Sequence, residues 1–423
     1  MNRRLGLRLG LLSEYDFRQL FVADTISQIG TQVTQIALPL VAILALDATP
    51  FEVGVLAACE TAAFLLVGLP AGAWVDRMRR RSVLIFGDVA RAVLLGSVPL
   101  AWWAGTLTMP QLYAVGLLLG VFTVFFDVAY QSYLPHLVGR ENLVEGNAKL
   151  EAVRGVSHVA GPTLGGLLVQ WLTAPVAIVV DAISFLVSAV FVGLIRKREP
   201  KPEPAPDRHL GREIGEGLRF VLHNRLLRSI AMCTGSANLF GSIAMTMVLV
   251  LLADELDVPA GTIGLLMSTG AIGGLVGAFT AMRIARWLGQ GPTIVYVIGV
   301  TAPFGLLLAV VQPGWMLWLG AAGFGMTMFG AVVYNIAQVS FRQGLTPERL
   351  LGRMNATMRF LVWGTMPLGG LIGGVLGASV GVRETVMIGM AGGCLAFLPV
   401  FFSPLRTMRE LPRGDEREPA PVG

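Results

Sequence analysis

The chain has 423 residues, of which 54% are hydrophobic and only 14% are charged, and its formal net charge is +5. A soluble domain carries about 25% charged residues, so this composition excludes a globule surrounded by water and predicts a protein solvated by lipid. The three cysteines lie far apart and show no disulfide or metal-ligand spacing, and we expect neither a metal nor a cofactor.

Twelve apolar segments are long enough to cross a bilayer, which takes about 20 helical residues. They lie near residues 19–46, 53–75, 82–104, 110–133, 143–171, 174–195, 227–252, 260–285, 292–312, 315–339, 352–379 and 384–404. Each span must be a helix, because its backbone groups find no water in the bilayer core. The sequence therefore predicts an all-α polytopic membrane protein.

Lysine and arginine fall in every second loop between these segments. They lie at 77–81, 140–149, 196–228, 283–286 and 342–353, whereas the intervening loops contain one cation, Arg383. Cytoplasmic loops carry the excess of Lys and Arg, so we expect a multi-pass protein of the cytoplasmic (inner) membrane with both termini in the cytoplasm. This distribution argues against nucleic acid as the partner of the positive charge.

The middle of the chain separates two halves. Four prolines within residues 200–206 prevent a helix, and apolar residues at helical spacing in 210–222 then predict an amphipathic helix. This helix either lies on the inner membrane surface or is a solvated linker helix. We expect an N-terminal six-helix bundle at 1–195, a cytoplasmic linker at 196–225, a C-terminal six-helix bundle at 226–410 and a disordered cytoplasmic tail at 411–423.

Short motifs recur in the same order in both halves. Residues 128–131 (Val-Ala-Tyr-Gln) return at 332–335 (Val-Val-Tyr-Asn), and residues 161–166 (Gly-Pro-Thr-Leu-Gly-Gly) return at 369–374 (Gly-Gly-Leu-Ile-Gly-Gly). Such a repeat predicts two pseudo-symmetric bundles with a binding site between them near the bilayer midplane.

A polar stripe follows the first span. Asp24, Gln28, Gln32 and Gln35 are spaced by four, four and three residues, which places them on one face of a helix. A polar stripe facing lipid is unfavourable, so this face contacts protein or an aqueous cavity. We expect Asp24 to titrate and the three glutamines to bind substrate; the alternative is a polar contact between helices, with Asp24 solvated.

Other polar residues of the spans are candidates for the same cavity. Asp127 lies one turn before Tyr130 and Gln131, and we expect it to carry a proton unless it caps a contact between helices. Further candidates for substrate binding are Asn238, Tyr334, Asn335 and Gln338. Together they form an aromatic and amide wall suited to a bulky amphipathic ligand. 

Two more ionisable side chains lie within spans. Glu60 and His158 could each take up a proton, or Glu60 could lie at the lipid edge and His158 could be buried with its hydrogen bonds satisfied.

Two motifs are candidates for gates. Around the cationic loop after the second span lie Gly72, Asp76, Arg77, Arg80 and Arg81, where Asp76 is suited to capping the N-terminus of a neighbouring helix. The cations also fit a purely topological role. In the fifth span, Gly161, Pro162, Gly165 and Gly166 allow a kink and close helix contact, so they form a hinge or seal, or simply a tight packing surface.

These motifs resemble those of the major facilitator superfamily. The segment from Gly72 to Arg81 resembles its signature loop between helices 2 and 3, with Arg79 in place of the usual Gly. The segment Gly161–Gly166 resembles the helix 5 motif of proton-driven antiporters, with Ser157 where a further Gly is expected. The segment Asp181-Ala182-x-Ser184-Phe185 is similar to a segment found in one branch of this superfamily, the branch that holds the enterobactin exporter and macrolide efflux proteins.

The resemblance implies a fold and a mechanism. The fold is twelve helices in two six-helix bundles, helices 1, 4, 7 and 10 line the cavity, and Asp76 pairs with helix 11, whose inner end carries Arg359. We therefore expect a proton-driven exporter of an amphipathic small molecule (drug, macrolide or siderophore type) that works by alternating access as a monomer. An importer or symporter of the same fold, or less plausibly a non-transporting sensor or assembly subunit, is the alternative. No Lys follows a Gly, which excludes the usual phosphate-binding loop, and we expect no enzyme.

Overall fold

The structure is a computed structural model that describes residues 10–68, 70–75, 77–139, 142–197, 199 and 210–409. The ordered elements within this part of the chain are helices, with no strand. The tail expected at 411–423 and the predicted gate residue Asp76 lie outside the described residues.

The N-terminal half begins with a short 3₁₀ helix, η1 (Gly10–Ser13), and then contains seven α-helices. They are α2 (Tyr15–Ala45), α3 (Pro50–Leu66), α4 (Pro70–Val75), α5 (Arg80–Trp103), α6 (Met109–Val138), α7 (Leu143–Leu172) and α8 (Ala174–Leu194). Because α3 and α4 together make one interrupted span, this half crosses the membrane six times. The interruption contains Gly68 and ends at Pro70, and both residue types disfavour an uninterrupted helix.

The C-terminal half follows the linker helix α9 (Leu210–His223). Its elements are α10 (Arg225–Val250) with η3 (Leu251–Glu255), α11 (Ala260–Leu288), α12 (Gln290–Thr301) with η4 (Ala302–Gly305) and α13 (Leu306–Ala309), α14 (Met316–Leu345), α15 (Glu348–Trp363), α16 (Thr365–Val380), α17 (Val382–Leu395), α18 (Leu398–Phe401) and η5 (Pro404–Thr407). Ten helical segments in the described part of the chain are long and apolar enough for a membrane span. The pair α3 and α4, and α7 with its charged first turns, complete the twelve expected spans.

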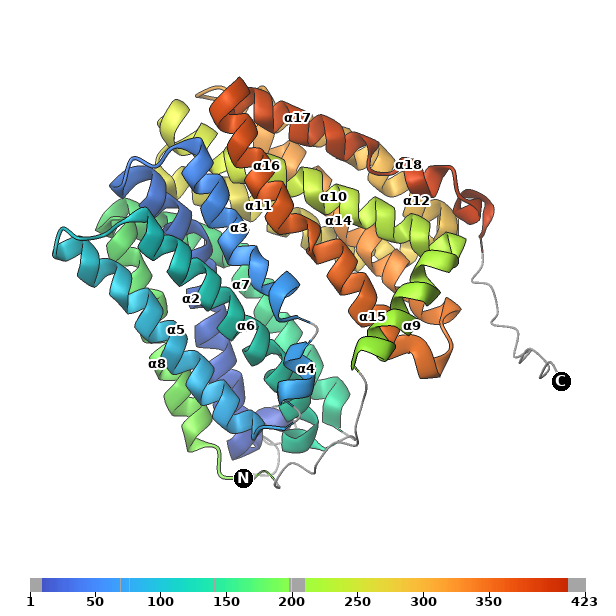
Figure 1. Cartoon of the computed structure of the whole chain (residues 1–423), viewed down its shortest axis with the longest axis horizontal. Helices are drawn as coiled ribbons and strands as arrows, with labels where there is room; N and C mark the ends of the chain where they lie inside the picture. Colours follow the sequence, from blue (N-terminus) through green and yellow to red (C-terminus); the bar gives the residue numbers. More distant parts are fainter. Residues whose placement is uncertain are drawn as a thin grey trace.

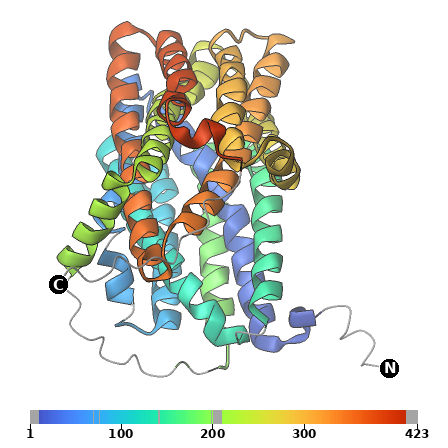
Figure 2. The ribbon, with the colours of Figure 1, turned by 90° about the vertical axis from the view of Figure 1, so that its right-hand side faces the viewer.

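The two halves share an apolar core at one end of the bundle only. One buried cluster joins α2 and α3 residues such as Val41 and Val53 to α10 and α11 residues such as Met247 and Ile263. At the opposite end, one cluster around Tyr133 belongs to the N-terminal half, and a separate cluster around Phe341 belongs to the C-terminal half. The halves therefore meet at one end and separate toward the other (Figures 1 and 2).

Small residues allow the close helix crossings at the joined end. A Cβ added to Gly166 of α7 would lie 2.2 Å from the Ala260 carbonyl oxygen of α11, and a Cβ added to Gly374 of α16 would lie 2.9 Å from the Gly54 Cα of α3. Since Gly166 and Gly374 occupy the same position of the sequence repeat, the two inter-half crossings are related by the pseudo-symmetry.

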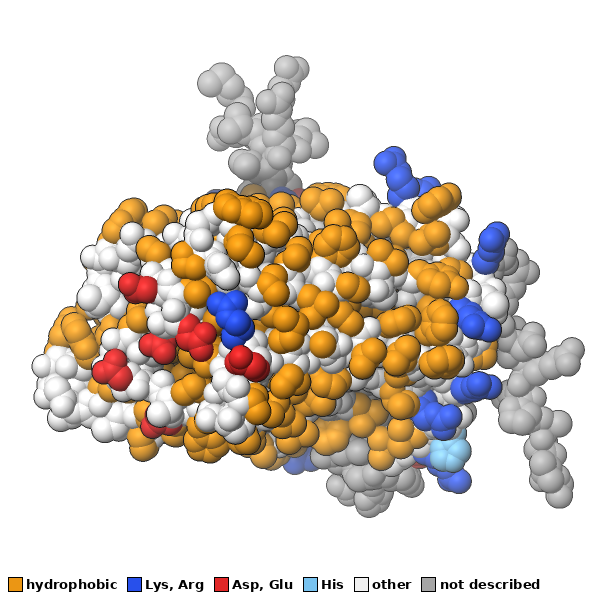
Figure 3. Space-filling view, turned by 90° about the horizontal axis from the view of Figure 1, so that it is seen from above, with side chains coloured by type: hydrophobic (Ala, Val, Ile, Leu, Met, Phe, Trp, Pro, Cys, Tyr) orange, Lys and Arg blue, Asp and Glu red, His pale blue; other side chains and the backbone are white. Residues whose placement is uncertain are grey.

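Charge distinguishes the two ends of the bundle. The joined end, which we call the acidic end, carries Asp47, Glu52, Asp254, Glu255, Asp257 and Glu384. The opposite end, which we call the basic end, carries the arginines at the start of α5, α10 and α15 and at the end of α11. Figure 3 shows acidic side chains gathered around a basic one toward one end, and most of the other Lys, Arg and His side chains toward the opposite end.

The linker helix α9 lies at the basic end and packs on α15. Val221 is completely buried within the apolar cluster of the C-terminal half. Glu216 forms an ion pair with Arg353 of α15. A protein neighbour therefore covers one face of this amphipathic helix, and its Leu222 is 40% exposed on another.

Candidate functional site

A small cavity lies where the two halves begin to separate. Its volume is about 210 Å³. It is lined by Phe64, Gly68, Gly72, Val124, Asp127, Val128 and Gln131 from the N-terminal half and by Ala356, Arg359, Phe360 and Trp363 from the C-terminal half. The opposing walls thus place a carboxylate and an amide of α6 across from a guanidinium and an indole of α15.

An aromatic contact bridges these walls. The Trp363 ring meets the Phe64 ring edge to face, with centroids 4.7 Å apart. The Arg359 guanidinium lies over the Trp363 ring, 4.7 Å from its centroid. Aromatic and cation–π contacts of this kind contribute about 0.5–1.5 kcal/mol each, so the platform is held in place while the Arg359 side chain stays exposed.

The polar stripe of α2 is divided among different surroundings. Asp24 is only 4% exposed, and its Oδ1 accepts a hydrogen bond from Gln28 Nε2 at 3.4 Å. Gln32 is also 4% exposed and lies directly under Gly161 of α7, while the Gln35 side chain is exposed. The helix therefore presents Asp24 and Gln28 as a pair, whereas Gln32 is covered by a neighbouring helix.

Two side chains of other helices approach Asp24. The Tyr130 hydroxyl of α6 lies near the Asp24 carboxylate without a well-formed hydrogen bond, and Arg154 of α7 is within electrostatic range. Arg154 itself forms an ion pair with Glu151 at 3.0 Å. Asp127 is likewise within electrostatic range of Asp24, so helices α2, α6 and α7 bring these ionisable groups into one region.

The expected residues of the C-terminal half mostly contact one another. The Tyr334 hydroxyl lies 2.7 Å from Thr234 Oγ1, and Tyr334 is 3% exposed. Gln338 Nε2 donates to Asn335 Oδ1 at 2.9 Å. Asn238 Nδ2 donates to the Val362 carbonyl oxygen at 3.0 Å. Val362 lies in the last turn of α15, just before the break that separates α15 from α16. None of these four expected residues lines the described cavity.

Glu60 and His158 also lie away from this cavity. Glu60 packs against α6, where a Cβ added to Gly116 would lie 3.2 Å from its Cγ. None of the described residues forms a hydrogen bond or an ion pair with its carboxylate. His158 is exposed on α7, within electrostatic range of Arg154.

The described arginines of the predicted gate contact their own half. Arg80 forms an ion pair with Glu199 at 3.5 Å, and Glu199 also accepts from the Arg81 backbone N–H at 3.2 Å. The Arg81 side chain donates to the Val192 and Gly193 carbonyl oxygens at the end of α8. Arg77 is exposed, while Gly72 lines the cavity.

The glycines and proline of α7 form a packing surface on two helices. Gly161 and Gly165 face Gln32 and Val33 of α2, and the Pro162 carbonyl faces Gly264 of α11. One of two hydrogen bonds found between the halves in the described chain joins Thr163 to Ser268 at 2.8 Å. The other runs from the Gly261 N–H to Gln170 Oε1 at 3.1 Å. These contacts place the motif at the joined part of the interface.

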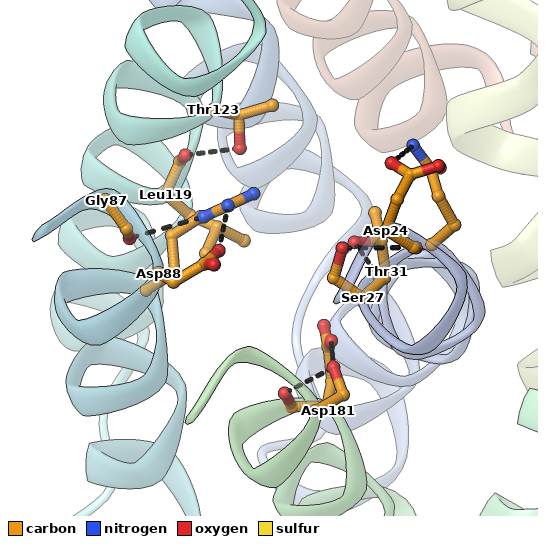
Figure 4. Close-up of polar contacts among 11 residues, drawn as sticks. Asp24, Ser27, Thr31, Gly87, Asp88, Leu119, Thr123 and Asp181 are labelled. Atoms are coloured by element: carbon orange, nitrogen blue, oxygen red, sulfur yellow. Dashed lines mark hydrogen bonds and ion pairs between the residues drawn. The ribbon is translucent and has the colours of Figure 1, made fainter. Parts of the chain in front are cut away.

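Behind α2 lies a second group of buried charges (Figure 4). Arg91 donates to Asp88 Oδ1 at 2.5 Å, and both residues are under 5% exposed. Thr34 donates to Asp181 Oδ2 at 2.5 Å, and Asp181 is 1% exposed. The Thr34–Asp181 bond joins α2 to α8. The Asp88–Arg91 pair lies within α5, and the Arg91 guanidinium lies over the Phe126 ring of α6 and the Phe185 ring of α8. None of these four charged or hydroxyl side chains lines the cavity.

Sequence reasoning missed several of the residues that line the cavity. Phe64, Phe360 and Trp363 were not expected in the cavity, although Phe360 and Trp363 closely follow the expected gate residue Arg359. Their signal was an aromatic pair at helical spacing beside a cation. Phe64 gave no such signal, because its place depends on the interruption between α3 and α4.

Comparisons with known proteins agree with this architecture. The model of the Major Facilitator Superfamily matches residues 20–366. The chain is 26% identical to the multidrug efflux pump Tap of Mycolicibacterium fortuitum, over 90% of this chain and 93% of that protein. It is 29% identical to the enterobactin exporter EntS of Escherichia coli, over 82% of each.

A solved structure shares the fold. The crystal structure of a bacterial homologue of the iron transporter ferroportin, in an inward-facing state, matches with a TM-score of 0.74 at 17% identity, over 91% of this chain and 97% of that one. The family match covers most of the chain, and the twelve spans form two pseudo-symmetric bundles. The chain therefore belongs to the major facilitator superfamily and is a multi-pass membrane transporter.

Proposed function

We propose that this protein exports an amphipathic small molecule across the inner membrane in exchange for protons. The observation that carries the proposal is Asp24, a buried carboxylate that Gln28 hydrogen-bonds and that no described cation pairs directly. It lies beside the region where the halves separate. The named efflux activities of the two similar proteins support export and a substrate of drug or siderophore type.

The charge distribution supports an orientation. Positive residues favour the cytoplasmic side, so we place the basic end and both termini in the cytoplasm. The joined acidic end then faces outward, and the cavity opens toward the cytoplasm. In this orientation the structure represents the state that loads substrate from inside the cell.

Proton coupling is assigned first to Asp24 and then to Asp127, with Glu60 and His158 as further proton sites. A ligand shifts the balance between two conformations only by its difference in affinity for them. A proton bound from outside and a substrate bound from inside must therefore favour opposite directions of the transition. Asp24 and Asp127 meet this requirement best, because they lie near the region where the two halves begin to separate.

The substrate is assigned to the cavity and the surface that continues from it. Gln131, Phe64 and Trp363 offer an amide and apolar faces, a mixture typical of sites for amphipathic ligands. We also assign to substrate binding, outside this cavity, the α2 and α6 residues Gln28, Gln32, Gln35 and Tyr130 and the α10 and α14 residues Asn238, Tyr334, Asn335 and Gln338. Gln32 and Tyr334 are buried here, so substrate reaches them only in a conformation that uncovers them. We assign gating to the α7 motif and to six further residues: Gly72, Asp76, Arg77, Arg80, Arg81 and Arg359.

Inverted membrane vesicles provide the test. A fluorescent amphipathic dye, chosen because a deletion strain is sensitive to it, is offered outside vesicles whose interior has been acidified. We expect accumulation that an uncoupler abolishes and that Asp24→Asn loses. Vesicles with Asp47→Asn, which removes an exposed acid far from the cavity, are the matched control. Accumulation that persists in the presence of the uncoupler contradicts the proposal.

A further inference from the structure

An open groove lies between the linker helix α9 and the start of α15 at the basic end. Its volume is about 510 Å³, and its lining includes Arg219, Phe220, His223 and Leu350. The Arg219 and His223 side chains are exposed, whereas Leu350 is 9% exposed. The groove thus has a polar, basic rim and an apolar floor.

Positive charge continues from this rim along the adjoining corner. Arg225 and Arg228 at the start of α10 are both exposed, and Arg228 Nη1 donates to the Leu222 carbonyl oxygen at 3.4 Å. The one acid that lines the groove, among the side chains described here, is Glu216, which Arg353 already engages in an ion pair. Among the described side chains, the groove and its adjoining corner therefore carry more positive than negative charge.

The position of α9 relative to the spans favours a lipid as the source of the complementary anion. Leu222 is 40% exposed only three residues before α10, a membrane-spanning helix, begins at Arg225. An exposed leucine beside a run of arginines at a span terminus is typical of a helix at the headgroup level. A basic pocket between helices on this side is suited to an acidic phospholipid headgroup.

The groove is mechanically connected to the transport cavity. A Cβ added to Gly217 of α9 would lie 2.5 Å from Thr357 Oγ1 and 2.9 Å from the Arg353 carbonyl oxygen of α15. Other positions of α15, Ala356 and Arg359, line the cavity. Any ligand that fixes α9 on α15 therefore acts on a wall of the cavity.

We propose that the groove between α9 and α15 binds an anionic phospholipid of the adjacent leaflet. Arg219 and His223 contact its phosphate, and its glycerol and upper acyl chain lie over Phe220, Leu222 and Leu350. This site is separate from the transport cavity, and its existence does not depend on the direction or coupling of transport.

Native mass spectrometry of the purified full-length protein tests the site. The probes are dioleoylphosphatidylglycerol, which is anionic, and dioleoylphosphatidylcholine, which has no net charge. We expect tighter binding of the anionic lipid. Arg219→Gln should weaken that binding about fivefold, the ratio that corresponds to about 1 kcal/mol for one cation near an acidic lipid surface, and Arg219→Lys should largely preserve it.

The matched control is Arg286→Gln, which removes an exposed arginine from the basic end of α11. Binding of the anionic lipid to this variant should equal that to the unchanged protein. Equal losses in the two glutamine variants indicate general surface charge and overturn the proposal, as does equal binding of both lipids. Displacement of the lipid by millimolar inorganic phosphate identifies a site for free anions and also overturns it.

Discussion

At the scale of single residues, ionisable groups divide unequally between the halves. Asp24, Glu60, Asp88, Asp127 and Asp181 all lie within spans of the N-terminal half. In the spans of the C-terminal half the acids whose side chains are described lie at the acidic end, while Arg342 and Arg359 lie toward the basic end. Carboxylates within the described spans are thus concentrated on one side of the interface, and the C-terminal half contributes cations and aromatic surface.

The variant Asp24→Asn tests whether proton coupling can be separated from the conformational change that carries substrate across the membrane. The amide can still accept the hydrogen bond from Gln28, but it cannot exchange a proton. We expect proton-driven accumulation to be abolished while exchange of labelled for unlabelled substrate continues, which a counterflow assay in proteoliposomes measures. Loss of both activities would show that the residue is needed for the conformational transition itself.

Trp363→Ala removes the aromatic platform of the cavity. It deletes the edge-to-face contact with Phe64 and the support beneath Arg359. It also removes an aromatic face for the ligand, and one aromatic contact is worth about 0.5–1.5 kcal/mol. We therefore expect KM for substrate to rise roughly two- to tenfold. Trp363→Phe keeps an aromatic face and should show a smaller increase. An unchanged KM in the alanine variant would place the substrate elsewhere.

The buried pair of Asp88 and Arg91 makes a stability prediction. Removing one partner leaves a buried charge without compensation, which costs about 3–5 kcal/mol. Asp88→Asn should therefore lower the thermal unfolding temperature, measured in detergent, by more than the double change Asp88→Asn with Arg91→Met. A double variant less stable than the single one would show that Arg91 is held mainly by the Phe126 and Phe185 rings.

At the scale of helices, the sequence repeat translates into equivalent contacts. Gly161 and Gly165 of α7 face α2 of their own half, and Gly369 and Gly373 of α16 face α10 of theirs. Gly166 and its counterpart Gly374 face the opposite half. A motif recognised in sequence thus predicts which helices approach closely, because only small residues permit such distances.

Other features of the site depend on tertiary neighbours and could not be read from the sequence. Asp24, Gln28 and Gln32 share a helical face, yet Gln32 is covered because α7 crosses at Gly161. Asn238 is likewise engaged by a carbonyl at the end of α15, 124 residues away. Periodicity defines the face of a helix, whereas the partner that covers it depends on how distant helices cross.

A methyl group at Gly166 should weaken closure of the acidic end. Its Cβ would meet the Ala260 carbonyl oxygen at 2.2 Å, so α7 and α11 must move apart. In a protein without its native cysteines, Ser268→Cys lies at this interface and should react faster with a membrane-impermeant maleimide when Gly166→Ala is present. Gly193→Ala, where nothing lies within 4 Å of the added Cβ, is the control. Equal reaction rates would contradict this role for the crossing.

At the scale of the whole molecule, the halves share a core at the acidic end and have separate cores at the basic end, and we propose that this arrangement is one of two alternating states. Movement to the other state requires that the apolar contacts at one end be replaced by contacts at the other. The linker helix α9 is packed and ion-paired on α15 of the C-terminal half. In the cycle that we propose, the two bundles rock against each other and α9 moves with the C-terminal bundle.

Double electron–electron resonance measures this movement directly. One spin-label pair replaces Asp47 and Glu255 at the acidic end, and a second replaces Ala148 and Gln343 at the basic end; all four side chains are exposed. Across changes of pH and addition of a transported dye, we predict that the acidic-end distance lengthens whenever the basic-end distance shortens. Distances that stay fixed under all conditions, or that lengthen together at both ends, would contradict alternating access by these two bundles.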